Sequence, residues 1–426
     1  MVYSTLLLLL ATGVLERTAA TPAFSLETRG GGGTVELTRR GGTIKGEDGF
    51  ARLDLLEQEL TSAVGKYARN AAIIELNRNN GTLAKLSKRQ LQALTYDGDA
   101  LWSGPIYVGT PPQAYNVYFD TASTDFLLPS YTCTTTDCLP RKRYDYRTNV
   151  EGGSTTAVDT DINVSSYWAT GSTGTGHLVR DTVTGAGRTA LNQDILTLTS
   201  FPSAVASHRT DGVLGLAYRT LSAAYSYSFP FTLSRAGMNP WVGLRLSPTP
   251  GQSQIAFAGY NRGKYYGAVK WFNVGQSSDT QFKTFWQIGG SGLMLGRKLV
   301  TDRGLYILDT GSSLIIAPSD IATQFWAGVD GARQEDLTYW SYPCDSPPDV
   351  SISFARVTNK LFTIAPEDFN IGQLPTDPTR CLGAVTAAEL GLDDGAVIVG
   401  EVFFKSWYVV LDTRKSLIGI ATPRKR

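Results

Sequence analysis

A carboxylate interrupts an apolar run near residue 120. The stretch "VYFDTASTDFLLPS" (residues 117–130) has the apolar content of a strand, with Asp120 between the apolar residues 117–119 and 126–128. An ionised carboxylate in such a segment loses its hydration unless a partner replaces it. The pattern therefore predicts a strand that ends in a carboxylate with a specific partner elsewhere in the chain.

Two further apolar patterns lie in the first 80 residues. Residues 4–15 form an apolar run shorter than the ~20 residues of a spanning helix, and small residues follow in "TAATP". This predicts a signal peptide over residues 1–20, with a buried N-terminal helix as the alternative. Residues 54–76 have the spacing of an amphipathic helix.

The rest of the chain gives no sign of a membrane anchor. No later segment reaches ~18 uninterrupted apolar residues, and the final "GIATPRKR" lacks the hydrophobic tail of a lipid-anchor signal. We therefore expect a secreted, extracellular protein without membrane contact, with the vacuole as the alternative location.

Composition favours a β-rich globular protein. The 426 residues are 42% hydrophobic and 18% charged, enough for one large bilobed unit or two to three domains. The 44 glycines, 20 tyrosines and 3 methionines favour strands and turns over helical bundles. The formal net charge of +1 gives no reason to expect a nucleic-acid partner.

Charge is unevenly distributed along the chain. Residues 21–89 carry 11 basic and 8 acidic side chains, a net +3, whereas residues 90–426 carry 27 and 29, a net −2. A basic leader that ends in "SKRQ" (residues 87–90) predicts a propeptide over residues 21–89, removed after Lys88 and Arg89. The basic residues 141–143 are the alternative processing site.

Four cysteines are consistent with secretion. Cys133, Cys138, Cys344 and Cys381 allow three disulfide connectivities in a secreted chain. We favour the local pairing, Cys133 with Cys138 and Cys344 with Cys381. A metal site is the weaker interpretation, because no CxxC or histidine spacing supports it.

An internal repeat supplies the partner of Asp120. In "ILDTGSSLIIAPS" (residues 307–319), Asp309 takes the place of Asp120, and proline follows nine residues later in both copies. Gly215 in "DGVLGL" and Gly400 in "VIVGEVFF" lie 95 and 91 residues after their aspartates. The chain therefore resembles a duplication with one aspartate in each half.

The ordered motifs resemble those of a pepsin-like aspartic protease, of the secreted fungal zymogen type, over residues 90–426. "GTPPQAYNVYFDTAS", "DGVLGLAY", "ILDTGSS" and "VIVGEVFFKSWYVVLDT" stand in family order, and "CTTTDC" and "YPCDSPPDVSISF" with Cys381 match the family's disulfides. The resemblance implies a mostly β, bilobal fold with lobes at residues 90–272 and 273–426 and a substrate cleft between them.

Two facing carboxylates account for the implied chemistry. Like charges about 4 Å apart at an effective dielectric near 20 repel by about 4 kcal/mol, or about three pKa units. One carboxyl of the Asp120/Asp309 pair therefore stays protonated, while the other takes a proton from a water that attacks the peptide carbonyl. The hydroxyls expected to hold this pair coplanar belong to Thr121, Ser123, Thr310 and Ser312.

The sequence offers few residues for other hydrolytic mechanisms. The chain has two histidines and no HExxH motif. We expect no cofactor and no metal.

The sequence departs from the family in three places. Ala122 replaces a glycine, and alanine is expected to fit there if its φ is negative. In the flap, "SSYWATGSTGTG" (residues 165–176), Trp168 takes the place of the family's tyrosine and Tyr167 precedes it. Adjacent strand residues point to opposite faces, so only one can serve the cleft in a regular strand, and we favour Trp168. Leu127 replaces the tryptophan that bonds the flap tyrosine in the family.

The remaining site residues follow from the alignment with the family. Asn163 in "NVS" fits the glycosylation pattern. Tyr118 and Val213 align near the substrate pocket, with plain core positions as the equal alternative. The other flap residues expected near substrate are Thr170, Gly171 and Ser172.

Together these features predict a monomeric aspartic endopeptidase that hydrolyses polypeptides at acid pH and is inhibited by its own propeptide. The competing class is a non-catalytic protein of the same fold that binds a peptide or protein in the cleft. It is disfavoured because both aspartates are present.

Overall fold

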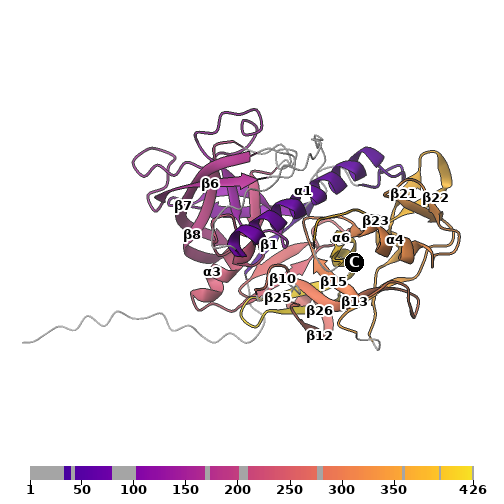
Figure 1. Cartoon of the computed structure of the whole chain (residues 1–426). Helices are drawn as coiled ribbons and strands as arrows, with labels where there is room; N and C mark the ends of the chain where they lie inside the picture. The colour runs from indigo at the N-terminus through magenta and orange to yellow at the C-terminus, as the bar shows by residue number, and fades with distance from the viewer. Residues whose placement is uncertain are drawn as a thin grey trace, which may run out of the picture.

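A computed structural model describes residues 33–39, 44–78, 102–167, 173–200, 210–275, 282–356, 360–392 and 395–424. The predicted signal peptide and the Lys88 and Arg89 processing site lie outside these residues. Within them the chain is mostly β and bilobal, as predicted, and a single long helix lies between the lobes (Figure 1).

The first lobe is built on an eight-stranded sheet in the order β2-β3-β4-β9-β5-β8-β7-β6. Its strands are β2 (Thr38–Arg39), β3 (Trp102–Val108), β4 (Gln113–Asp120), β5 (Phe126–Pro129), β6 (Val158–Tyr167), β7 (Thr173–Gly185), β8 (Arg188–Leu198) and β9 (Gly212–Gly215). The fully buried strands β5 and β9 are continuous apolar runs, as expected of strands covered on both faces.

The second lobe has two sheets, one of eight strands and one of four. The larger contains β13 (Gln287–Leu295), β14 (Lys298–Leu299), β15 (Gly304–Leu308), β16 (Ile315–Ala317), β19 (Val350–Ser353), β20 (Phe362–Thr363), β23 (Val385–Ala387) and β24 (Val397–Val399). The smaller contains β17 (Arg333–Gln334), β18 (Trp340–Pro343), β21 (Asn370–Leu374) and β22 (Asp377–Gly383).

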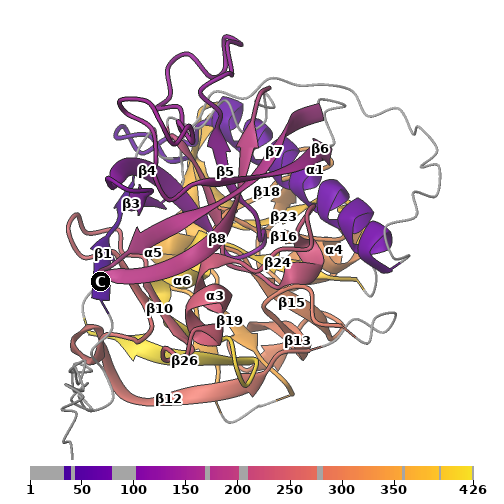
Figure 2. The ribbon, with the colours of Figure 1, turned by 90° about the vertical axis from the view of Figure 1, so that its left-hand side faces the viewer.

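A six-stranded sheet has the strand order β1-β11-β10-β25-β26-β12. Its strands are β1 (Gly33–Glu36), β10 (Trp241–Arg245), β11 (Gln254–Phe257), β12 (Tyr265–Asn273), β25 (Tyr408–Asp412) and β26 (Leu417–Pro423). Its strands β12 and β26 lie on the side of the molecule away from α1 (Figure 2). The main hydrophobic core is one cluster that draws side chains from both lobes, so the lobes share a common interior.

Short helices complete the structure. They are η1 (Arg219–Leu221), α3 (Phe229–Arg235), η2 (Arg262–Lys264), α4 (Ser319–Trp326), α5 (Pro366–Phe369) and α6 (Glu401–Ser406). Among the described residues, no helix has both the length and the hydrophobicity needed to cross a bilayer.

The predicted amphipathic helix is present as α1 (Leu53–Arg78), slightly longer than residues 54–76. Before it, β1 adds an edge strand to the six-stranded sheet and β2 pairs with β3 of the first lobe. Phe50 then forms a bridge with Gln373 of the second lobe. The N-terminal segment therefore contacts all three main parts of the molecule, and α1 crosses from the second lobe to the first (Figure 1).

The disulfide pairing is confirmed. Cys133 is joined to Cys138, Cys344 is joined to Cys381, and no free cysteine remains in the chain. Asn163 is exposed on β6, which leaves its predicted glycosylation sterically open but untested.

Candidate active site

Asp120 and Asp309 occupy equivalent places in the two lobes. Asp120 is the last residue of β4, which pairs in parallel with β9 so that Asp120 lies opposite Gly215. Asp309 directly follows β15, which pairs in parallel with β24. A third strand completes each arrangement. In the first lobe β5 pairs antiparallel with β9, and in the second lobe β16 pairs antiparallel with β24. The duplication predicted from the sequence is thus a duplication of topology.

The repeated glycines are explained by close backbone contact. A Cβ atom on Gly215 would collide with the backbone of Thr124, and one on Gly400 would collide with the carbonyl oxygens of Ser312 and Leu314. Each glycine therefore lets the loop after its aspartate pack directly against the neighbouring strand.

Two threonines lock the aspartate loops together. Thr121 Oγ1 donates to the carbonyl of Leu308 at 2.8 Å and accepts from the Thr310 amide at 2.9 Å. In the mirrored arrangement, Thr310 Oγ1 donates to the carbonyl of Phe119 at 2.7 Å and accepts from the Thr121 amide at 3.1 Å. These buried bonds fix the two loops relative to each other across the lobe interface.

The carboxylates are held by their own loops. Asp120 Oδ1 accepts from the Ala122 amide and Asp309 Oδ1 from the Gly311 amide, each at 2.8 Å. Ser312 Oγ donates to Asp309 Oδ2 at 2.6 Å. Its counterpart Ser123 Oγ is buried and has no hydrogen-bond partner among the described residues. Of the four predicted supporting residues, Ser312 thus bonds a carboxylate directly, and Thr121 and Thr310 bond the facing loop. Their role in keeping the carboxyls coplanar stays a prediction.

A lysine from α1 lies on the two carboxylates. Lys66 Nζ is 2.6 Å from Asp309 Oδ2, 3.4 Å from Asp120 Oδ1 and 3.2 Å from the carbonyl of Gly311. The neighbouring Tyr67 hydroxyl donates to the same Asp309 Oδ2 at 2.9 Å. Lys66 is 8% exposed and Tyr67 is fully buried, so α1 closes the carboxylate pair off from solvent.

The electrostatics of this cluster are asymmetric. Burial acts to raise the pKa of Asp309, but the Lys66 ammonium, together with the Ser312 and Gly311 bonds, holds that pKa below its ordinary value. Burial raises the pKa of Asp120, Lys66 opposes the rise and the negative charge of Asp309 adds to it. Burial acts to lower the pKa of Lys66, but the two carboxylates outweigh it and raise that pKa.

Ala122 fits its position, as expected. It is fully buried, its φ is not positive, and its amide bonds Asp120. Its counterpart Gly311 could not carry a side chain so easily, because a Cβ there would lie 2.7 Å from Lys66 Nζ and 2.8 Å from Asp120 Oδ1.

The polar contacts of α1, those of Lys66 and Tyr67 included, were not predicted from the sequence. Arg69 forms a buried ion pair with Asp125, with 2.9 Å between Nη2 and Oδ2, and Asn70 Nδ2 donates to the carbonyl of Ala122 at 2.8 Å. Nearer the start of the helix, Glu59 Oε1 accepts from Ser313 Oγ at 2.6 Å. The one available signal was the i, i+3 spacing of Lys66 and Arg69, which places two cations on one helix face.

Tyr118, Val213 and Leu127 form one row across β4, β9 and β5. The strand register places Tyr118 opposite Val213 and Val213 opposite Leu127. All three are buried in a small cluster beside the Cys133–Cys138 disulfide. Burial raises the pKa of the Tyr118 hydroxyl, Asp120 adds to the rise and Arg69 opposes it.

The predicted flap lies at the tips of β6 and β7. Tyr167 is the last residue of β6 and pairs with Thr173 of β7. Trp168, Thr170, Gly171 and Ser172 lie outside the described residues, so the assignment of the flap residue stays a prediction.

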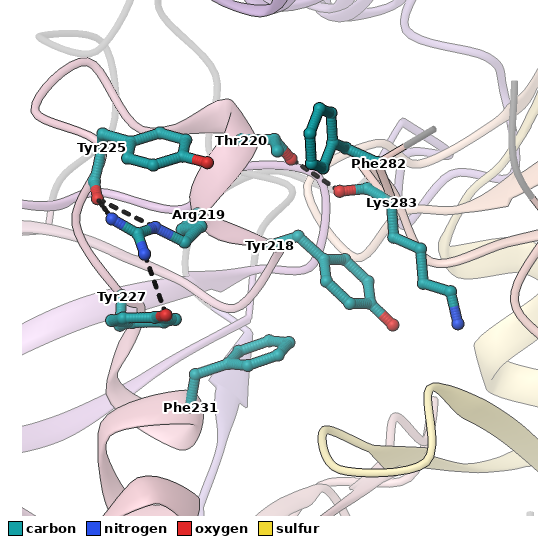
Figure 3. A pocket seen from close by; sticks show the side chains of 8 residues that line it. All are labelled: Tyr218, Arg219, Thr220, Tyr225, Tyr227, Phe231, Phe282 and Lys283. Carbon is teal, nitrogen blue, oxygen red and sulfur yellow. Dashed lines mark hydrogen bonds between the residues drawn. The ribbon is translucent and has the colours of Figure 1, made fainter. Parts of the chain in front are cut away.

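A hollow of about 330 Å³ lies beside η1. Figure 3 shows the side chains that line it. Asn77 Nδ2 donates to the carbonyls of Thr220 and Ser222, which anchors the helix end to η1. Thr220 Oγ1 in turn donates to the Lys283 carbonyl at 2.6 Å. The hollow is lined by Tyr218, Arg219, Thr220, Tyr225, Tyr227, Phe231, Phe282 and Lys283.

Arg219 fills one side of this hollow. Its guanidinium stacks on the rings of Tyr225 and Tyr227 and donates to the Tyr225 carbonyl and the Tyr227 hydroxyl. The hollow therefore presents aromatic rings and cations, in contrast to the acidic pair beneath α1. Among the described residues, no group of three or more histidine, cysteine or acidic side chains is arranged to hold a metal ion.

Comparison with known proteins agrees with this geometry. Residues 102–423 match the family model described as eukaryotic aspartyl protease. An aspartic protease of Phaffia rhodozyma is 27% identical over 385 residues, which cover 88% of this chain and 87% of that protein.

Two other relatives give the same result. Major aspartyl peptidase 1 of Cryptococcus neoformans is 27% identical, over 76% of this chain and 68% of that protein. Sheep chymosin is 28% identical, over 76% of this chain and 81% of that protein. The chain belongs to the eukaryotic aspartyl protease family and is an aspartic-type endopeptidase.

Proposed function

We propose that the protein is a secreted zymogen whose Asp120/Asp309 pair hydrolyses peptide bonds at acid pH once α1 has left the cleft. The observation that carries the proposal is the paired geometry itself. Two aspartates sit on equivalent loops, which are cross-bonded by Thr121 and Thr310, and an ammonium group covers them.

The chemistry requires the two carboxyls to differ in protonation. With Lys66 removed, two buried carboxylates this close cannot both remain ionised, so they share one proton and titrate as a pair. The ionised member takes a proton from a bound water, which attacks the peptide carbonyl carbon. The protonated member donates a hydrogen bond to the carbonyl oxygen and stabilises its developing charge. Proton transfer to the amine then releases it as the C–N bond breaks.

The surrounding loops support this chemistry. The threonine bonds fix the two aspartate loops relative to each other, which would limit the reorganisation needed on the way to the transition state. Tyr118 and Val213, in the buried row with Leu127, are candidates for the wall of the substrate pocket. The flap, with Trp168 as the favoured contact, would cover bound substrate and exclude water.

The N-terminal segment is proposed to act as an intramolecular inhibitor. Lys66 and Tyr67 occupy Asp309 Oδ2, the atom that would otherwise face water or substrate. The inhibition therefore rests on specific contacts as well as on the basic surplus of residues 21–89. We propose lobe boundaries at residues 90–272 and 273–426, and removal of the segment after Lys88 and Arg89.

Replacement of either aspartate tests the proposal. Asp120→Asn and Asp309→Asn should each lower kcat for a peptide substrate by at least ~1,000-fold after the segment has been removed, because each leaves the pair without one of its two roles. Circular dichroism and thermal unfolding would verify the fold. Substantial hydrolysis by either variant would refute the paired mechanism, and an inactive parent enzyme would favour the non-catalytic binder.

A further inference from the structure

Asp125 is a third buried carboxylate, near the catalytic pair in the chain. It lies five residues after Asp120, immediately before β5, and is 3% exposed. Its Oδ2 accepts from Arg69 Nη2 at 2.9 Å and from the Ala223 amide at 3.2 Å. Its Oδ1 has no hydrogen-bond partner among the described residues. The mechanism proposed above makes no use of this group.

The cation that neutralises Asp125 is Arg69 of α1, the helix that must leave the cleft before the enzyme can act. Arg69 is one turn after Lys66 on α1, so its backbone lies about 4.5 Å further along the helix axis. Both side chains of the Arg69–Asp125 pair are 1% exposed. Departure of α1 therefore opens a space of guanidinium size that ends in a carboxylate lacking its cation.

A substrate side chain can reach this space. An extended peptide advances about 3.3 Å per residue, so a side chain one or two residues from the scissile bond lies at the distance of Arg69 from Lys66. Tyr118 lies near enough to Arg69 for the two to interact electrostatically, and its row with Leu127 and Val213 gives an apolar surface for the methylene stem of a long basic side chain.

We propose that Asp125 is a specificity determinant of the mature enzyme and selects substrates with arginine or lysine near the scissile bond. The inference rests on the proposed function, because it requires α1 to vacate the cleft. In the zymogen, Arg69 occupies the position that the substrate cation takes later. A guanidinium can donate to both oxygens of a carboxylate, which would also satisfy Oδ1.

The other sites contacted by α1 do not compete for such a side chain. Glu59, which bonds Ser313, belongs to α1 and leaves with it. The hollow of Figure 3 carries the cations Arg219 and Lys283 and would repel a basic side chain. Among the residues that the structure describes, Asp125 is thus a carboxylate outside the catalytic pair that loses its cation when the helix departs.

A matched pair of peptides tests this inference without any variant. One otherwise neutral peptide library carries arginine at each position within four residues of the scissile bond, and its twin carries citrulline, which has the same shape without the charge. At about pH 5 we expect mature enzyme to cleave one arginine peptide about 10- to 100-fold faster in kcat/KM than its citrulline twin.

A variant then assigns the effect to one residue. Asp125→Asn should bring the arginine/citrulline ratio close to one and leave cleavage of the citrulline peptide within about threefold. Glu151→Gln, which removes an exposed carboxylate of the same lobe, should leave the ratio unchanged. No preference in the parent enzyme, or a preference that survives in Asp125→Asn, would overturn the inference alone. Failure to cleave any peptide would overturn the proposed function and this inference with it.

Discussion

At the scale of single residues, one difference between the two aspartate loops is a single methyl group. Ala122 carries a Cβ where Gly311 has none, although both amides bond a carboxylate at 2.8 Å. Ala122 tolerates its methyl because its φ is not positive. At Gly311 a methyl would approach Asp120 Oδ1 to 2.8 Å, which is closer than a carbon and an oxygen pack without a shift of the loop.

This asymmetry gives a prediction with a built-in control. Ala122→Gly should leave kcat/KM of the mature enzyme within about threefold and lower the free energy of unfolding by roughly 0.5–1 kcal/mol, through added backbone entropy in the unfolded chain. Gly311→Ala should lower kcat about 10-fold or more, because the methyl displaces a carboxylate. Peptide hydrolysis and thermal unfolding of both variants check this. Equal effects on kcat would contradict the structural reason given for the asymmetry.

The residues that could be predicted from the sequence are those repeated in it. Asp120 and Asp309 were found because a motif recurs with its glycine at nearly equal spacing, and Thr121 and Thr310 came with the motif. Lys66 could not be assigned to Asp120 and Asp309, nor Arg69 to Asp125, because 54, 243 and 56 residues separate these partners along the chain. Only the packing of α1 across the lobes brings them into contact.

At the scale of elements, the β6–β7 hairpin is where the chain departs most from the family pattern. Its strands pair from Val158 to Tyr167, so the register is known up to the residue before Trp168. Leu127 is buried in the row with Tyr118 and Val213. An apolar contact between the Trp168 indole and this row would close the flap by burial, without the hydrogen bond of the family.

Two single variants separate the candidate flap residues. If Trp168 covers the substrate, Trp168→Ala should raise KM and lower kcat together, by about 10-fold or more in kcat/KM, because the flap orients substrate and excludes water. Tyr167→Ala should then be nearly silent. The opposite ranking on the same peptide would assign the role to Tyr167 through a one-residue shift of the hairpin.

The elements themselves were predictable where local pattern decides them. The helix predicted at residues 54–76 is α1, with its ends moved by one and two residues. The apolar runs around Asp120 are β4 and β5. By contrast, the pairing of β1 with β11 across 218 to 224 positions depends on the finished six-stranded sheet, and no local signal in "GTVE" reveals it.

At the scale of the whole molecule, α1 couples the state of the cleft to pH. Asp309 has a lowered pKa in the closed form, so its ionised state favours α1. This stabilisation is complete above the ordinary carboxyl pKa of about 4 and is lost as pH falls through the lowered value. Asp120 has a raised pKa and acts in the opposite sense, but it is farther from Lys66 Nζ, at 3.4 Å against 2.6 Å. Lys66, with its raised pKa, stays charged throughout this range.

We therefore expect the intact chain to stay closed near neutral pH and to open as the pH falls below about 4. Binding of a fluorescent statine-type inhibitor reports an open cleft, provided that mass spectrometry shows the chain to be uncut. Lys66→Gln should bind the inhibitor at a pH at least one unit higher than the parent, because removing one partner of a buried ion pair is strongly destabilising, by about 3–5 kcal/mol.

Arg78→Gln is the matched control for this experiment. It removes one positive charge from the same helix, but Arg78 is exposed and lies at the helix end, 12 residues after Lys66. If the attraction between α1 and the body came only from the net charge of the segment, the two variants would shift the opening equally. If Arg78→Gln opens at the same pH as the parent and Lys66→Gln opens at a higher pH, the pH dependence comes from the contact between Lys66 and Asp309. Equal shifts of the opening pH in the two variants would instead attribute the pH dependence to the general charge surplus of residues 21–89.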